Sequence, residues 1–110
     1  MSDDDDTANV TDVRDDPEAN RYAVTVAGKL VGLARYSRRG GRTIFTHTEV
    51  DPELEGQGVA SALIAGALDA ERAAGRPVVP ICPFVAAYIE RHQEYANLVD
   101  QQLLAQIDDA

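Results

Sequence analysis

The sequence predicts a single α/β domain of the α+β type, with a mostly antiparallel sheet in the order β-β-β-α-β-α and a C-terminal helical segment. Its 110 residues are enough for one hydrophobic core but not for two. The first half alternates polar and apolar residues, as strands do, whereas residues 59–74 repeat with a helical period. No apolar run is long enough to span a membrane.

Three antiparallel strands are expected in the first half. Residues 21–27 alternate and lead, through a two-residue turn at Gly28-Lys29, to a partner strand over residues 30–36. Gly40-Gly41 makes a second reversal into residues 42–50, which are rich in β-branched and aromatic side chains. A three-stranded meander is the simplest arrangement of these segments.

One helix with both ends marked follows the meander. Asp51-Pro52 ends the third strand, and residues 59–74 are rich in alanine with an apolar stripe at helical spacing. Gly75 fits the left-handed position after a helix, and Pro77 fits the position shortly beyond it.

The rest of the chain predicts a buried strand and further helical structure. Residues 77–82 (PVVPIC) are short and apolar, as expected of a strand joined to the sheet by a helical crossover. Pro80 cannot donate a ladder hydrogen bond, so this strand must diverge from a neighbour or lack one there. Pro83 suits the first turn of a helix over residues 84–92, and a weaker helical pattern ends at residues 103–107.

We expect three segments along the chain. Residues 1–12 have no periodicity and predict an acidic disordered tail. Residues 13–102 contain all of the well-marked elements and form the expected domain. Residues 103–110 are the expected end of the last helix and a short tail.

The net charge of −9 is concentrated in the tails. Residues 1–20 carry about −7 and residues 100–110 about −3, whereas residues 21–99 are near +1. This acidity excludes a nucleic-acid binder, while a near-neutral body does not repel a small anionic ligand. One lysine against nine arginines and twelve aspartates suits a protein dissolved in strong salt, although codon bias and an acidic leader give the same composition. We expect a solvated hairpin tip at four arginines, Arg35, Arg38, Arg39 and Arg42, with attraction of the acidic N-terminal tail or of a cofactor phosphate as the alternative.

The cysteine count and the N-terminal residues indicate the cellular compartment. The chain has one cysteine, Cys82, and two histidines, so neither an intrachain disulfide nor a Cys/His metal site is expected. The start MSDDDDT is the opposite of the basic and apolar start of a signal peptide. We therefore expect a cytoplasmic protein that is not exported and does not associate with membranes.

A glycine-bearing loop before the long helix predicts an anion site. Two glycines allow close backbone approach, and a helix start leaves several N–H groups unpaired at the positive end of the helix dipole. The spacing fits neither the Walker A motif nor the dinucleotide fingerprint, and an ordinary glycine-rich helix entrance is the alternative. The candidate cofactor-binding residues are Gly56, Gln57, Gly58, Val59 and Ala60.

The run HTEVDPELEGQGVA (residues 47–60) and the later Cys82-Pro83-Phe84 resemble small GCN5-related N-acetyltransferase (GNAT)-like proteins, a minimal subgroup of the acetyl-CoA-dependent acetyltransferases. The resemblance extends over about residues 13–99 and implies a minimal GNAT-like fold, acetyl-CoA as the cofactor and pantetheine laid beside Pro80. Glu55 departs from the Arg or Gln that opens the superfamily's pyrophosphate loop. The superfamily's usual Asn after the later strand is also missing, which puts its common water relay in doubt.

Cys82 is the first candidate catalytic residue. A residue before proline is held in an extended conformation, so Cys82 should lie at the N-cap of the following helix, where the dipole favours a thiolate. The alternative is a small buried hydrophobe at a strand end. The resemblance favours a catalytic role, because a cysteine in this motif is the proposed catalytic residue of the subgroup.

His47 and Glu49 are the other candidates, as a base and the partner that orients it. They lie two apart on a strand and share a face, yet this spacing is too long for an ideal hydrogen bond, so one of them is expected to serve the substrate and the other the structure. An exposed polar pair is the alternative. We expect a structural role for His92 at a helix end, and core packing or the acyl end of the site for Tyr88 and Tyr95.

The expected function is transfer of an acetyl group from acetyl-CoA to an unidentified amine, on a small molecule or a protein, through or near Cys82. The main alternative is a non-catalytic module that binds acyl-CoA or a protein partner. A third possibility is a structural domain in which the glycines only shape a turn. The sequence does not identify the acceptor.

Overall fold

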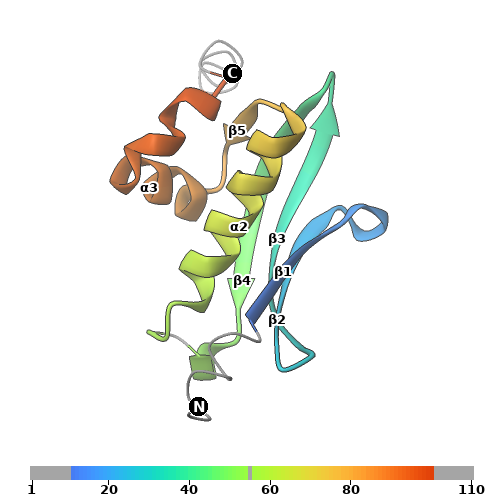
Figure 1. Cartoon of the computed structure of the whole chain (residues 1–110), viewed down its shortest axis with the longest axis vertical. Coiled ribbons are helices and arrows are strands. Elements are labelled where there is room, and N and C mark those ends of the chain that lie inside the picture. The colour runs from blue at the N-terminus through green and yellow to red at the C-terminus, as the bar shows by residue number, and fades with distance from the viewer. Residues whose placement is uncertain (1–10, 55, 101–110) are drawn as a thin grey trace.

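The computed structural model describes residues 11–54 and 56–100, which form one five-stranded sheet with helices packed against it (Figure 1). The strands lie in chain order, β1-β2-β3-β4-β5. The elements are β1 (Thr11–Asp16), η1 (Pro17–Ala19), β2 (Arg21–Val26), β3 (Lys29–Arg39), β4 (Arg42–Val50), η2 (Pro52–Leu54), α2 (Val59–Ala74), β5 (Val78–Pro80), α3 (Pro83–Arg91) and η3 (Gln93–Leu98). No helix of the described residues is long and apolar enough to cross a membrane. The predicted α+β class is confirmed.

The first strand, β1, was not predicted. We expected folded structure to begin near Val13 and only three strands before the long helix, but β1 begins at Thr11 and pairs antiparallel with β2. Its hydrophobic pattern is weak because Val13 is its only apolar side chain. Packing supplies what the pattern lacks: a Cβ added at Gly66 of α2 would lie 2.8 Å from the Cβ of Val13, so only glycine allows this approach. The C-terminal helical segment that we expected at residues 103–107 lies outside the described residues.

The two hairpin turns use left-handed residues. The turn between β2 and β3 is formed by Ala27 and Gly28, with φ angles of 52° and 81°, and not by Gly28-Lys29 as expected. Lys29 pairs with Val26 instead and belongs to β3. Gly40 and Gly41 form the second turn as predicted, with φ angles of 58° and 78°. Positive φ at both central residues matches the right-handed twist of the adjoining strands.

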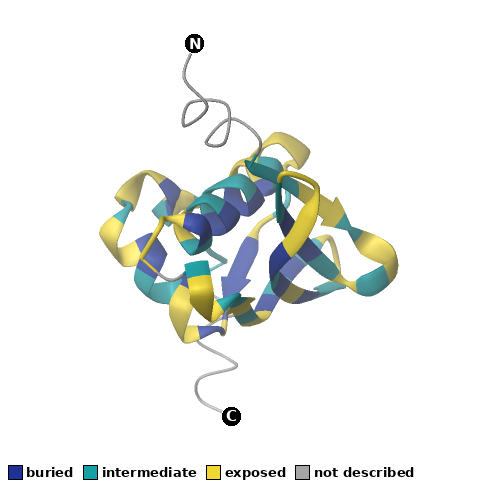
Figure 2. Cartoon of the chain, turned by 90° about the horizontal axis from the view of Figure 1, so that it is seen from below, coloured by how far each residue is buried: buried dark blue, intermediate teal, exposed yellow. Residues whose placement is uncertain are grey.

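The long helix, α2, has the predicted bounds and covers one face of the sheet. Gly75 ends it in the left-handed conformation, with φ of 72°, and donates to the Arg72 carbonyl. Leu63, Ile64 and Leu68 of α2 are buried against the strands, and Figure 2 shows the buried segments of the helix and the sheet toward each other. α3 contacts β4 and β5 and joins the same core.

β5 pairs in parallel with only part of β4. The pairing runs from Thr43 with Val78 to Phe45 with Pro80. Cys82 N–H then donates to the Phe45 carbonyl at 2.9 Å, after which the chain turns into α3. Among the described residues, no strand therefore pairs with residues 46–50 of β4 on this side. This agrees with the expectation that the strand containing Pro80 diverges from its neighbour.

Candidate functional site

An open cavity of about 490 Å³ lies where β4, the loop after it, the start of α2 and α3 meet. This volume is within the range of small-molecule sites in proteins. Among its lining residues are Thr48 and Val50 from β4, Gly56 and Gly58 from the loop, Val59, Ala60 and Ser61 from α2, and Phe84 and Arg91 from α3. Four of the five residues predicted to bind a cofactor are therefore in its wall.

The start of α2 presents backbone donors at this cavity. The first hydrogen bond of the helix joins Ala62 N–H to the Gly58 carbonyl at 2.9 Å, so the N–H groups of residues 59–61 have no partner in the helix ladder. Gly56 and Gly58 have φ angles of 85° and 80°, which glycine adopts without strain. Added Cβ atoms at these two glycines would meet nothing within 4 Å. The arrangement favours an anion close to the backbone.

Gln57 differs from the other predicted binding residues. Its N–H donates to the Leu54 carbonyl at 3.1 Å and does not point to a ligand, and the residue is not in the cavity wall. The Gln57 amide instead closes the turn that connects η2 to the glycine loop. The backbone donors available to an anion thus start after Gln57, in the first turn of α2.

Cys82 is the N-cap of α3, as its position before Pro83 predicted. Its φ and ψ of −61° and 124° are extended, and the side chain is buried with 4% of the residue exposed. The Sγ atom lies 3.4 Å from Thr48 Oγ1, and either atom can be the donor. Because Thr48 is also in the cavity wall, this contact joins Cys82 to the cavity.

His47 and Glu49 form a pair with each other. His47 Nε2 lies 3.0 Å from Glu49 Oε1, so the expectation that their spacing is too long for a hydrogen bond was wrong. The side chains are 54% and 60% exposed. β4 has a register shift beside Thr46 in its pairing with β3, and the strand is irregular there. No hydrogen bond of the described residues joins His47 to Cys82.

Neither Phe84, which was named only within the Cys82-Pro83-Phe84 motif, nor Arg91 was predicted to bind a ligand, although both lie in the cavity wall. They are seven residues apart on α3, which is about two helical turns, and therefore share a face. This spacing was the signal in the sequence that could have paired the two residues. It identifies a ligand-facing side only once the packing of α3 is known, because another side of the helix carries the buried Val85 and Ile89.

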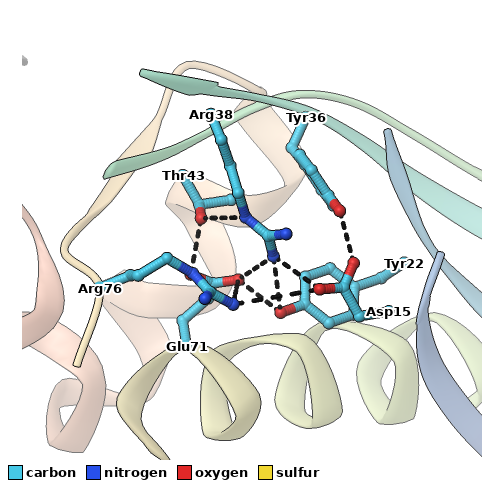
Figure 3. Close-up of polar contacts among 7 residues, drawn as sticks. All are labelled: Asp15, Tyr22, Tyr36, Arg38, Thr43, Glu71 and Arg76. Atoms are coloured by element: carbon cyan, nitrogen blue, oxygen red, sulfur yellow. Dashed lines mark hydrogen bonds and ion pairs between the residues drawn. The ribbon is translucent and has the colours of Figure 1, made fainter. Parts of the chain in front are cut away.

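A second polar cluster lies near the other end of α2, around the completely buried Glu71 (Figure 3). Arg38 Nη2 and Arg76 Nε each donate to its carboxylate at 2.8 Å, and Thr43 Oγ1 donates at 2.6 Å. Tyr22 also donates its hydroxyl to Glu71. The cluster is completed by Asp15, which accepts from Arg38 at 2.8 Å and from Tyr36. We name these seven residues the Glu71 cluster.

The environment of the Glu71 cluster changes the acidity of its members. Burial alone raises the pKa of Glu71, but hydrogen bonds from Arg76, Thr43, Tyr22 and Arg38 outweigh it and leave that pKa lowered. Burial and the bond to Glu71 raise the pKa of Tyr22. The sequence assigned Arg38 to a solvated hairpin tip, and this was wrong because its guanidinium joins Glu71 and Asp15.

The remaining aromatic and histidine residues have structural contacts. His92 Nδ1 lies 2.9 Å from the Tyr88 carbonyl and its ring stacks on Tyr88, which confirms the structural role expected at this helix end. Tyr88 and Tyr95 are buried, as core packing requires. Tyr95 donates its hydroxyl to Asp69 at 2.8 Å, and burial with this bond raises its pKa to about 12.

Solved structures with the same fold are acetyltransferase-like proteins. The solution structure of a GCN5-like protein from Staphylococcus aureus matches 80% of this chain and 86% of its own, with a TM-score of 0.62 and 19% identity. A crystal structure of a GCN5-related N-acetyltransferase from Kribbella flavida matches 66% of this chain, with a TM-score of 0.50 and 25% identity. The match covers only 21% of that second chain. A search of curated proteins found no match.

The fold of the described residues is thus the one seen in these GCN5-related structures. The family model for GCN5-related N-acetyl-transferase matches residues 21–98, which is more than half of the chain. The chain belongs to the GCN5-related N-acetyltransferase family.

Proposed function

We propose that this protein binds acetyl-CoA in the cavity at the start of α2 and transfers the acetyl group to an amine. The observation that carries the proposal is the position of the unpaired N–H groups of residues 59–61 in the wall of a ligand-sized cavity. Membership of an N-acetyltransferase family supports the reaction class. The acceptor is an amine on a small molecule or a protein.

The residues of the cavity fit the phosphate groups of coenzyme A. The backbone donors of α2 supply hydrogen bonds, and glycine at positions 56 and 58 leaves room for the ligand to approach them. Val50, Leu54 and Val59 supply an apolar wall for the uncharged part of the molecule. When bound, acetyl-CoA supplies an acetyl group activated as a thioester.

The three predicted catalytic residues, His47, Glu49 and Cys82, are not in the wall of this cavity, and we propose their roles in the transfer from their contacts. Glu49 accepts a hydrogen bond from His47, fixes the ring through Nε2 and leaves Nδ1 to accept a proton from the amine. Thr48 holds the thiol of Cys82 beside the cavity. We assign Cys82 to the acyl group, either as its temporary carrier or as a group that assists direct transfer.

Substitutions at Ser61 test the binding site and are expected to leave the fold intact. It is exposed, lies in the first turn of α2 and lines the cavity. Ser61→Asp adds a carboxylate beside the proposed phosphate site, and we expect CoA to bind at least about tenfold more weakly in low salt. Ser61→Asn has nearly the same shape without the charge and should bind within about threefold of the parent. Calorimetric titration with CoA measures the affinity of each variant. Equal affinity of the two variants would show that the phosphate site is not beside residue 61.

Single-turnover assays with labelled acetyl-CoA and a panel of amines test the chemistry. Cys82→Ala and His47→Ala should each slow transfer by about 10²-fold or more. His92→Ala is the matched control, because the His92 side chain has its described hydrogen bond to the Tyr88 carbonyl of α3 and the substitution should leave transfer intact. Transfer at the parent rate by both Cys82→Ala and His47→Ala would contradict the assigned chemistry.

A non-catalytic CoA-binding module is the second candidate. The separate pairing of His47 with Glu49 and of Cys82 with Thr48 favours it, because no described hydrogen bond connects the proposed base to the thiol. Such a module would bind CoA in calorimetry yet turn over none of the amines. Absence of CoA binding would exclude both candidates.

A further inference from the structure

Only two charged side chains line the described wall of the cavity, those of Asp51 and Arg91. Asp51 is partly satisfied, because its Oδ1 accepts a hydrogen bond from Glu53 N–H at 3.0 Å. It nevertheless brings a negative charge to a cavity proposed to hold phosphate groups. Arg91 offsets that charge, and without it the charge of the described wall would repel an anion.

The packing of α3 fixes where Arg91 lies. The N-cap of the helix is the buried Cys82, whose N–H donates to the carbonyl of Phe45 in β4 and whose own carbonyl accepts from Ala86 N–H. Ile89, two residues before Arg91, is buried in the core. The helix therefore cannot rotate freely, and its last turn carries Arg91 to the cavity that Phe84 enters from the first turn.

Arg91 also differs in its partners from most arginines of the chain. Arg38, Arg42, Arg72 and Arg76 are bound to carboxylates, carbonyls or amides. Arg91 is exposed, and its guanidinium has no hydrogen bond or ion pair within residues 11–54 and 56–100. The Arg91 guanidinium and the unpartnered backbone donors of α2 line the same cavity, which suits a phosphate, since the planar fork of an arginine can donate two bonds to one anion.

We propose that Arg91 is a phosphate-binding residue that contacts the same pyrophosphate as the first-turn N–H groups of α2. This inference rests on the proposed function, because it assumes that CoA occupies the cavity. It assigns to α3 a binding role in addition to packing. It also predicts that the site recognises phosphate through one side chain and one helix start, on two different elements.

The test compares Arg91→Gln with the parent by calorimetric titration in low salt, using CoA and dephospho-CoA, which lacks the 3′-phosphate. A pyrophosphate contact predicts that both ligands bind about tenfold more weakly to the variant, by the same factor. Arg91→Lys keeps the charge and should recover part of the loss. Arg39→Gln removes an equally exposed charge at the far hairpin and should change neither affinity. Thermal unfolding of each variant shows that it is folded.

The outcomes separate this inference from the proposed function. If the parent binds neither ligand, the proposed function fails and the inference fails with it. If the parent binds CoA and Arg91→Gln binds it equally well, only the role of Arg91 is overturned. If the variant loses affinity for CoA but not for dephospho-CoA, the contact is with the 3′-phosphate and the pyrophosphate assignment is wrong.

Discussion

The two ends of α2 use charge in opposite ways. At the C-terminal end, Glu71 is completely buried and receives hydrogen bonds from four side chains. At the N-terminal end, backbone donors and the Arg91 guanidinium face an open cavity without protein partners in the described residues. A polar group can stay unpartnered only where water or a ligand reaches it, because a buried one loses its solvation. The comparison separates the polar groups that hold the fold from those free to bind.

Each end also connects different parts of the fold. The Glu71 cluster joins α2 to all four antiparallel strands, through Asp15 of β1, Tyr22 of β2, Arg38 of β3 and Thr43 of β4 (Figure 3). The cavity joins α2 to α3 and to the part of β4 that does not pair with β5. Substitutions in the cluster should therefore act mainly on stability, and substitutions at the cavity mainly on binding.

The largest effect is expected for Glu71→Ala. This change leaves the partly exposed Arg38 and Arg76 guanidinium groups without the buried carboxylate that they share, and should lower the free energy of unfolding by about 3–5 kcal/mol. Urea unfolding measures the loss. Glu90→Ala removes an exposed glutamate from α3 and should change stability by less than about 0.5 kcal/mol. Equal losses for the two variants would mean that the cluster does not stabilise the fold.

The second-largest effect is expected from low pH, which should weaken the Glu71 cluster. Because the pKa of Glu71 is lowered in the folded protein, its contribution is fully present above the unfolded glutamate value of 4.5 and is lost as pH falls below it. Glu71→Gln cannot titrate at this position. The stability gap between the parent and Glu71→Gln should therefore be wide at pH 7 and shrink below about pH 4. Urea unfolding across this pH range measures the gap, and a constant gap would contradict the lowered pKa.

Periodicity and glycine position were enough to predict most of the fold. α2 was predicted with its observed bounds because an apolar stripe, a left-handed glycine and a following proline all agree there. β1 was missed because a strand with one apolar side chain depends on its partners, here β2 and Gly66. A local sequence pattern predicts a helix or strand only when the residues of that element themselves have the hydrophobic periodicity or the end signals.

The candidate site could be predicted only in part for the same reason. The glycine loop and the N-cap cysteine are local features, and the structure has Gly58 and Cys82 at the two expected helix starts. Arg91 and Thr48 reach the cavity through packing of distant segments, which no local spacing shows. Glu71 did leave a signal, because it follows Ile64, Ala67 and Leu68 on the buried stripe of α2. A glutamate in that position needs cationic partners.

A smaller effect should separate the arginines of the two ends. Arg76→Gln removes two hydrogen bonds to the buried Glu71 carboxylate and should cost about 1–3 kcal/mol of stability. Arg91→Gln removes an unpartnered charge and should cost less than about 1 kcal/mol, mainly from its favourable position at the end of α3. Urea unfolding of the two variants in parallel measures both. A larger loss for Arg91→Gln would show that its role is structural.

The smallest effect concerns the start of α2, whose first turn contains no acidic residue. Ser61→Asp should stabilise the fold by about 0.3–1 kcal/mol in low salt, by placing a carboxylate at the positive end of the helix. Ser61→Asn lacks the charge and should not show this gain. Salt near 1 M should remove most of the gain, since the site is exposed. Thermal unfolding at two salt concentrations measures the effect. If Ser61→Asp both stabilises the fold and weakens CoA binding, the positive end of the α2 dipole is the source of both effects. If Ser61→Asp lowers stability and Ser61→Asn does not, a negative charge in the first turn of α2 is unfavourable and the prediction is wrong.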